Sequence, residues 1–278
     1  MATKTFQGTW ITESGSMIYR VVPKCACSTI GQIMYYSDHG KFFDGDIHDA
    51  KDGILKWGQE ENRDAIRSAV LKNACVRFTC VRNPFTRVLS SFFDKIAGLQ
   101  RNGKKYRGKQ LQAILDKYKI DVGHPDENFQ FDQIEMFRRF LLLAHDTMIA
   151  KTPIKADIHW ASISGHMARF VRNGGSYDYI FPAEAFNAGM QIVLDRSKTP
   201  YPIDLDAVPR FNESSGHGPV RAHPVPDFFD DVSMHRVWKI YKNDFRLFGY
   251  SFENPGIQAP VSEIDVEQVN KKLSKGEG

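Results

Sequence analysis

The segment Lys24–Thr29 directly follows an apolar run and contains one cation, two hydroxyl groups and three small side chains. The preceding residues, Met17–Pro23, are mostly apolar or β-branched and end in proline, which predicts a short buried strand. Apolar residues at helical spacing then predict a helix that begins near Ser28. A strand-to-helix turn of this kind offers amide N–H groups and the positive end of a helix dipole to an anion.

The residue types in this turn suit an anionic ligand. Lys24 would add a mobile positive charge, and Ser28 and Thr29 would donate hydrogen bonds. The remaining positions carry small side chains that would let backbone amides approach the ligand: Cys25, Ala26 and Cys27. The turn lacks the glycines and the Gly-Lys-Ser/Thr order of a nucleoside-triphosphate P-loop, which disfavours a nucleoside triphosphatase. Taken alone, the segment also fits a surface lysine before an ordinary turn.

The segment Arg82–Ser90 repeats this architecture after a second predicted strand, Cys75–Val81. Asn83-Pro84, as N-cap and first helical residue, predicts that a helix follows the strand at once. Arg82 would lie at the end of the strand, where a guanidinium group can form two hydrogen bonds with a phosphate. Ser90 falls about two turns into the helix.

The predicted helix also carries a polar face opposite its phenylalanines. This face consists of Arg87, Ser90, Ser91 and Asp94. A solvated helix face, with hydroxyls bonded to backbone carbonyls, would explain it without a ligand. However, two basic strand-to-helix turns on one sheet favour a ligand with two separated anionic groups, because open α/β sheets bind ligands at the carboxyl ends of their strands.

The composition is that of a globular protein with ample material for a core. Of the 278 residues, 42% are hydrophobic and 25% are charged, which excludes a disordered chain, a fibrous rod and a disulfide-rich miniprotein. The net charge of +4 favours anionic ligands but is too small to indicate nucleic acid binding. We expect a cytoplasmic protein without a membrane segment, because no long apolar run and no signal peptide is present.

The four cysteines are Cys25, Cys27, Cys75 and Cys80. Their spacing is not typical of a zinc or redox site, and two of them lie in an apolar segment. We therefore expect reduced thiols and no metal.

Strands and helices alternate along the chain, which predicts an α/β fold with a central parallel sheet flanked by helices. Tyr177–Pro182 predicts a third strand, and further helices are expected over 63–71, 131–144 and 186–194 and around Val237–Phe248. Residues 199–226 are rich in proline and glycine and predict a long loop able to serve as a lid. No linker is visible, so we expect a single domain over residues 1–278, with a core at about 17–250 and a flexible tail over 255–278.

Pro23–Thr29 resembles the 5′-phosphosulfate loop of the sulfotransferases that use PAPS (3′-phosphoadenosine 5′-phosphosulfate). Arg82–Lys95 resembles their 3′-phosphate motif, with Arg82 and Ser90 at the family's spacing. The match is best to the carbohydrate sulfotransferase branch that includes the chondroitin and HNK-1 enzymes, and it runs from about Tyr19 to Tyr250. Further matches in family order are His159-Trp160, then Tyr177-Asp178 with Ile180 and Glu184, then Tyr241, Asp244-Phe245, Phe248 and Tyr250.

This resemblance implies a three-layer, P-loop-like sulfotransferase fold and transfer of a sulfuryl group from PAPS to an acceptor hydroxyl, with the bisphosphate PAP as product. Lys24 would stabilise the leaving oxygen, and the loop Cys25–Thr29 would hold the 5′-phosphate. Arg82 and Ser90 would bind the 3′-phosphate. A metal is not required, because the sulfuryl group carries less charge than a phosphoryl group.

An acceptor hydroxyl needs a general base with a pKa near neutrality. His48 is the first candidate, because it follows the first predicted helix and lies between Asp46 and Asp49, which would orient it and raise its pKa. The resemblance supports this choice, since a histidine in a similar place is the base in some heparan sulfotransferases. His159, Glu184 and Asp46 are the alternatives.

The expected acceptor is a carbohydrate hydroxyl. The basic residues Arg101, Lys104, Lys105, Arg107 and Lys109 would steer an acidic polysaccharide or simply form a solvated surface. Tyr106 and Trp57 would suit stacking on sugar rings. Charged groups of the long loop would close over a ligand or remain exposed: Arg210, His217, Arg221 and His223. Two alternatives stay open, a small-molecule or lipid sulfotransferase with the same donor site and a non-catalytic nucleotide-binding scaffold protein of the same fold.

Overall fold

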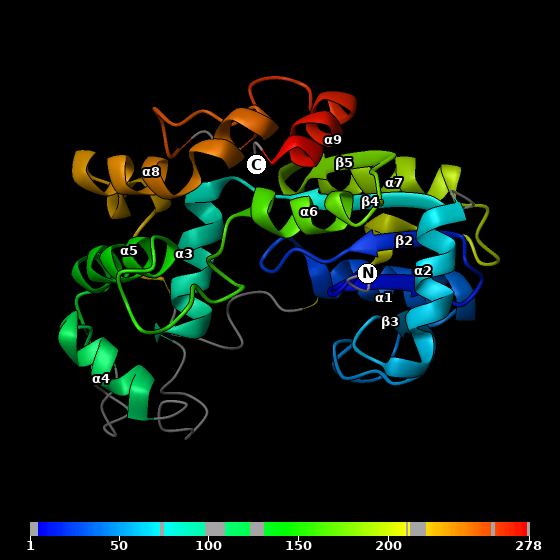
Figure 1. Cartoon of the computed structure of the whole chain (residues 1–278), viewed down its shortest axis with the longest axis horizontal. Coiled ribbons are helices and arrows are strands. Elements are labelled where there is room, and N and C mark those ends of the chain that lie inside the picture. Colours follow the sequence, from blue (N-terminus) through cyan, green and yellow to red (C-terminus); the bar gives the residue numbers. More distant parts are fainter. Residues whose placement is uncertain are drawn as a thin grey trace.

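The structure is a computed structural model, and it describes residues 5–72, 75–97, 109–122, 131–209, 211, 221–256 and 259–276. Its centre is a 5-stranded sheet with the strand order β3-β1-β2-β4-β5 (Figure 1). Helices pack around this sheet, and a second group of helices, α3, α5 and α8, extends to one side of it (Figure 1). The α/β fold expected from the alternation of elements is confirmed.

Three neighbouring strands, which reach from the centre of the sheet to one of its edges, are the ones that the sequence predicts. They are β2 (Met17–Arg20), β4 (Val76–Val81) and β5 (Tyr179–Pro182). β4 pairs in parallel with both of its neighbours, with Met17 opposite Val76 in one ladder. Parallel strands end at the same edge of a sheet, so the turns that follow β2 and β4 are neighbours in space.

Two further strands were not expected, and they make the sheet mixed rather than wholly parallel. β1 (Thr9–Thr12) runs antiparallel to β2 and to β3 (Ile54–Lys56). β1 (Thr-Trp-Ile-Thr) and β3 (Ile-Leu-Lys) each hold only two consecutive apolar residues, a run too short to predict a buried strand. They extend the sheet beside α1 (Cys27–His39) and the loop that follows this helix.

The remaining helices are α2 (Arg63–Lys72), α3 (Pro84–Lys95), α4 (Lys109–Lys117), α5 (Gln133–Met148), α6 (Ile163–Arg172), α7 (Phe186–Arg196), α8 (Asp231–Phe248) and α9 (Val266–Lys275). The start of α3 is as predicted: the side chain of Asn83 accepts a hydrogen bond from the amide of Phe85, and proline stands at the first helical position. Phenylalanines join α3 to α5 and α8, since Phe85 contacts Phe245 and Phe92 contacts Phe137.

The C-terminal segment differs from the flexible tail that the sequence predicts. α9 buries Val269 and Leu273 against the core and lies beside α6 (Figure 1). The side chain of Asn270 donates to the carbonyl of Tyr177 and accepts from its amide, at 2.9 Å in each case. α9 is therefore attached to the rest of the fold beside Tyr177, just before the start of β5.

Candidate active site

The turn after β2 presents the N-terminus of α1. Lys24 and Ala26 both have positive φ, 67° and 57°, a left-handed conformation that costs about 1–2 kcal/mol for residues other than glycine. Ala26 is the N-cap of α1 and provides no side-chain cap, and the first turn holds no acidic residue. The turn therefore has the sharp backbone path and the positive helix end that suit an anion.

Arg82 joins this turn to the one after β4. Its Nη1 donates to the carbonyl oxygen of Lys24 at 3.1 Å, and its Nε donates to the hydroxyl of Thr86 at 3.2 Å. Both basic turns therefore meet at one edge of the sheet, with the guanidinium group held between them. Ser90 lies half-buried on α3, two turns further along.

Lys24 forms an ion pair with Asp94, near the end of α3. Nζ lies 2.9 Å from Oδ2, and Nζ of Lys95 lies 3.1 Å from the same oxygen. Burial would raise the pKa of Asp94, but its interactions with the two lysines outweigh this and lower the pKa below the usual range. Asp94 is thus a carboxylate with two cationic neighbours, a role that the sequence did not indicate beyond its place on the polar face of α3.

Other groups on that polar face are structural rather than solvated. Arg87 is only 1% exposed, and it donates from Nε to the carbonyl of Pro23 at 3.1 Å and from Nη1 to that of Ala161 at 2.8 Å. The hydroxyl of Ser91 donates to the carbonyl of His159 at 2.7 Å. The bond to Pro23 fixes the start of the Lys24 turn against α3, because Pro23 directly precedes it, and the other two bonds fix the segment 159–161 against the same helix.

His48 lies beside the N-terminus of α1, in the loop that leads to β3. Its Nε2 is 3.1 Å from the hydroxyl oxygen of Ser28 and 3.7 Å from the sulfur of Cys27. Desolvation against this turn lowers the pKa of His48, and the opposing effects of Asp46 and Asp49 are smaller. The sequence predicts that the two aspartates raise the pKa of His48. In the structure they do favour the charged form, but desolvation of the ring is larger, so the net shift is downward.

Lys56 holds the loop that carries His48, and sequence reasoning missed it. Its buried Nζ donates to the carbonyl oxygens of Ile47, His48 and Ala50 at 2.7, 3.1 and 2.6 Å. The same ammonium lies 5.2 Å from the ring centre of Trp10, which also contacts the imidazole of His48. A lysine in a three-residue strand gives no sequence signal for this role.

The alternative bases have structural partners. Nδ1 of His159 is hydrogen-bonded to Asp157, whose carboxylate also accepts from the His159 amide at 2.9 Å. Glu184 accepts from the amide of Asn83 and from the hydroxyl of Tyr250, both at 2.9 Å, and so joins the start of α3 to the end of α8. Asp46 accepts from the amide of His48 at 2.9 Å.

The cysteines of the turn are thiols. Burial raises the pKa of Cys25 to about 12 and also raises the pKa of Cys27. All four cysteines of the chain are free. Cys25 fills the core beneath the turn, and Cys27 is half-buried beside His48.

Several candidates for acceptor contacts take no part in the described site. Trp57 is buried against Phe6, 5.5 Å between ring centres, and is not free to stack on a sugar. Arg221 and His223 are exposed before α8. The other candidates, Arg101, Lys104, Lys105, Tyr106, Arg107, Arg210, His217 and the side chain of Lys109, lie outside the described residues.

The model of the sulfotransferase family matches residues 7–251, which include every element of this site. The chain belongs to the sulfotransferase family. Carbohydrate sulfotransferase 10 of Xenopus laevis is 25% identical to the chain over 190 residues, which are 64% of the chain and 48% of the relative. The match thus spans about half the length of that relative. No solved structure matches the chain.

The cytoplasmic location expected from the sequence is corrected by this match, because carbohydrate sulfotransferase 10 is a Golgi membrane enzyme. Among the residues that the structure describes, no helix is long and apolar enough to cross a bilayer.

Asp244 and Tyr241, two further positions of the sequence resemblance, join α8 to other parts of the fold. The buried carboxylate of Asp244 accepts from the amides of Ile163 and Ser164, both at 2.8 Å, and so caps α6. The hydroxyl of Tyr241 donates to the carbonyl of Trp160 at 2.6 Å. These contacts tie α8 to the start of α6 and to the segment that carries His159.

Proposed function

We propose that this sulfotransferase transfers the sulfuryl group of PAPS to a hydroxyl group of a carbohydrate. The observation that carries the proposal is the hydrogen bond from Arg82 to the carbonyl of Lys24, because it joins two basic turns into one site for a doubly anionic nucleotide. Bound PAPS would supply the activated sulfuryl group, and PAP would be released.

The residues present fit this donor. The amides of the turn Cys25–Thr29 and the hydroxyl of Ser28 would hold the 5′-phosphate at the positive end of α1. Arg82 and Ser90 would bind the 3′-phosphate. Within the described part of the chain, Nη2 of Arg82 has no protein acceptor, so this nitrogen is available to a phosphate oxygen.

Lys24 would stabilise the oxygen that leaves when the sulfuryl group is transferred. Its ammonium belongs to the turn that leads directly into α1. To act, the Lys24 ammonium must weaken its ion pair with Asp94 and interact with the leaving oxygen instead. The negative charge on that oxygen is more concentrated than the charge on the carboxylate. Asp94 retains Lys95 as a partner during this exchange.

His48 would take the proton of the acceptor hydroxyl. A general base must be neutral before it accepts a proton, and the lowered pKa of His48 keeps the imidazole neutral at physiological pH. Its Nε2 is directed at Ser28 in the same turn, so a hydroxyl placed there would lie beside the sulfuryl group held by Lys24. Lys56 would position His48 through the backbone of its loop.

The carbohydrate acceptor is inferred from the relative that is named a carbohydrate sulfotransferase. A small-molecule or lipid acceptor would use the same donor site, and a scaffold protein would bind the nucleotide without transfer. These alternatives are distinguished by experiment.

The test has a binding arm and a transfer arm. Thermal shift with PAP, AMP and ATP measures donor-site selectivity, and labelled PAPS with a panel of carbohydrate, phenolic and lipid hydroxyls measures transfer. We expect stabilisation by PAP that is lost in Arg82→Ala, and transfer that is lost in Lys24→Ala but not in Lys271→Ala on α9. Stronger stabilisation by ATP with Mg²⁺, or PAP binding without transfer to any acceptor, would contradict the proposal.

A further inference from the structure

One face of α8 carries a row of basic side chains far from the donor site in the sequence. His235, Lys239, Lys242 and Arg246 follow one another at intervals of four, three and four residues, and all four are exposed. This spacing places them on one side of the helix, over a length of about 16 Å at 1.5 Å per residue. Tyr241, with non-helical φ and ψ, bends the helix in the middle of the row.

The charges of this row are not compensated by neighbours. Within the described residues, no carboxylate forms an ion pair with any of the four side chains, whereas Arg138 on the adjacent α5 is paired with Asp230. In this part of the chain, Lys239, Lys242 and Arg246 are thus unpaired cations in a row, and such a row produces a positive potential that attracts an extended anion.

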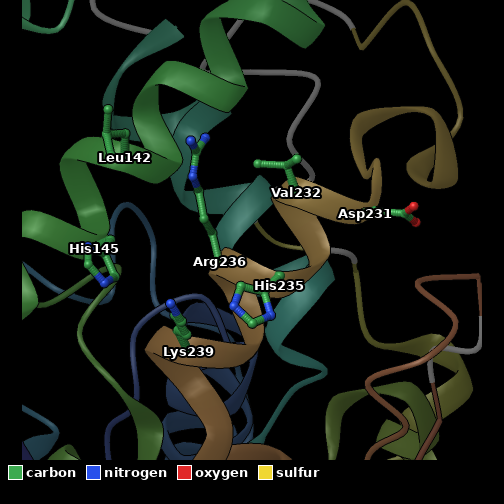
Figure 2. A pocket seen from close by; sticks show the side chains of 7 residues that line it. All are labelled: Leu142, His145, Asp231, Val232, His235, Arg236 and Lys239. Carbon is green, nitrogen blue, oxygen red and sulfur yellow. The ribbon is translucent and has the colours of Figure 1, made fainter.

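The N-terminal half of the row borders a shallow pocket of about 420 Å³ between α5 and α8 (Figure 2). His145 from α5 and Arg236 from α8 also line it, but both have carboxylate neighbours: Nδ1 of His145 lies 3.0 Å from Asp146, and Arg236 helps to lower the pKa of Asp230. The carboxylate that belongs to the lining, Asp231, points away from these groups in Figure 2. Leu142 and Val232 contribute exposed apolar surface.

Aromatic side chains lie beside the same row. The ring of Trp238 is stacked with His235, with ring centres 6.1 Å apart, and it contacts Phe252 at 6.2 Å. Arg246 lies over Trp238 at 6.0 Å, and Phe252 is 48% exposed. Aromatic rings next to cations suit the apolar faces and acidic groups of a charged sugar.

We infer that the row on α8, with its pocket and its aromatic side chains, is a second binding surface for a chain of acidic sugars. A compact anion would engage only one or two of the cations, whereas a polymer with regularly spaced carboxylate or sulfate groups engages the whole row. The surface shares no residue with the donor site. The choice of a carbohydrate partner rests on the proposed function, but binding to the surface does not require the donor.

The test measures binding of the full chain to a labelled hyaluronan decasaccharide by fluorescence anisotropy, without PAP or PAPS. We expect binding that weakens as salt increases and that is about 2- to 30-fold weaker in Lys239→Gln/Lys242→Gln, the range for two exposed charge pairs. Phe252→Ser is expected to weaken binding without changing its salt dependence. The matched control is Lys271→Gln/Lys275→Gln on α9, which removes the same charge elsewhere.

Equal weakening by both double variants would show attraction to net charge alone and overturn the inference. Tighter binding of phosphatidylserine vesicles or of an RNA oligonucleotide than of the decasaccharide would also overturn it. Sulfate transfer to a monosaccharide acceptor is measured in the same variants and should not change. Selective decasaccharide binding by a chain that transfers no sulfate would support this inference and contradict the proposed function.

Discussion

Lys24 and Asp94 lie 70 residues apart in the sequence, yet Nζ of the lysine is 2.9 Å from Oδ2 of the aspartate. The group proposed to stabilise the leaving oxygen is thus shared with a carboxylate of α3. An anionic donor must compete with this carboxylate for Lys24, so Asp94 sets how strongly the turn attracts the donor.

We therefore expect Asp94→Asn to bind PAP more tightly than the wild type. Removing one negative charge about 5 Å from the ligand is worth about 1 kcal/mol, or roughly fivefold in affinity, even at the dielectric constant of bulk water. Titration calorimetry at constant ionic strength measures the change. Asp121→Asn, an exposed aspartate outside the site, is the control. Weaker binding by Asp94→Asn would mean that Asp94 organises the turn instead of competing with the donor.

Arg82→Ala should abolish selectivity for the 3′-phosphate. The loss of a charge-assisted bond of about 1.5–3 kcal/mol predicts PAP binding that is roughly 10- to 150-fold weaker. AMP lacks the 3′-phosphate, so its affinity should change far less. Calorimetry with both nucleotides measures this difference, and Arg67→Ala on α2 controls for the loss of an arginine. Equal losses for PAP and AMP would indicate that Arg82 acts only by holding the Lys24 turn.

The rate of transfer should fall as the pH is lowered through the pKa of His48. Because that pKa lies below 6.5, the imidazole is neutral at pH 7 and becomes protonated, and unable to act as a base, only in more acidic solution. Single-turnover rates between pH 4.5 and 8 measure the effect. His48→Gln should lose most of the activity, about 10²–10⁴-fold, and the acidic fall in rate with it. An unchanged pH profile in the variant would assign the base to another residue.

His166 should make the fold less stable in acid. Burial lowers its pKa to about 4, from 6.5, and its Nε2 is 2.8 Å from the carbonyl oxygen of Ile158. Between these pH values the unfolded chain binds the proton and the folded chain does not, so stability is present above pH 6.5 and decreases as the pH falls towards 4. Over this pH interval, the contribution of His166 to the free energy of unfolding decreases by about 3 kcal/mol.

Urea unfolding of the wild type and of His166→Gln at several pH values measures this contribution. The stability of the variant should depend less on pH over the same interval. Parallel curves for the two proteins would show that other groups cause the acid sensitivity. His223→Gln, at an exposed position, serves as the control.

Lys56→Met should impair catalysis by loosening the loop of His48. The change removes an ammonium bound to three carbonyl groups, and we expect a loss of about 1–3 kcal/mol in stability. The maximal rate should fall while PAP affinity is kept, because among the described residues no hydrogen bond or ion pair joins Lys56 to the donor-binding turns. Lys51→Met, exposed in the same loop, is the control. A loss of PAP affinity equal to the loss of rate would contradict this positioning role.

The two basic turns and the strands before them could be predicted from the sequence because local signals encode them. The apolar runs of β2 and β4, the Asn83-Pro84 start of α3 and the helical spacing after Ser28 each depend on residues a few positions apart. The parallel arrangement then required both turns to lie at one edge of the sheet, and the bond between Arg82 and Lys24 agrees with that expectation.

Only the tertiary structure decided which groups face one another across that edge. Lys24 pairs with Asp94, and Lys56 holds the His48 loop from β3. Trp57 is buried. Each of these features depends on contacts between different segments of the chain. The antiparallel strands β1 and β3 and the docking of α9 depend on the same long-range packing. No local pattern determines such contacts, because their free energy comes from surfaces that exist only once the sheet and its helices have assembled.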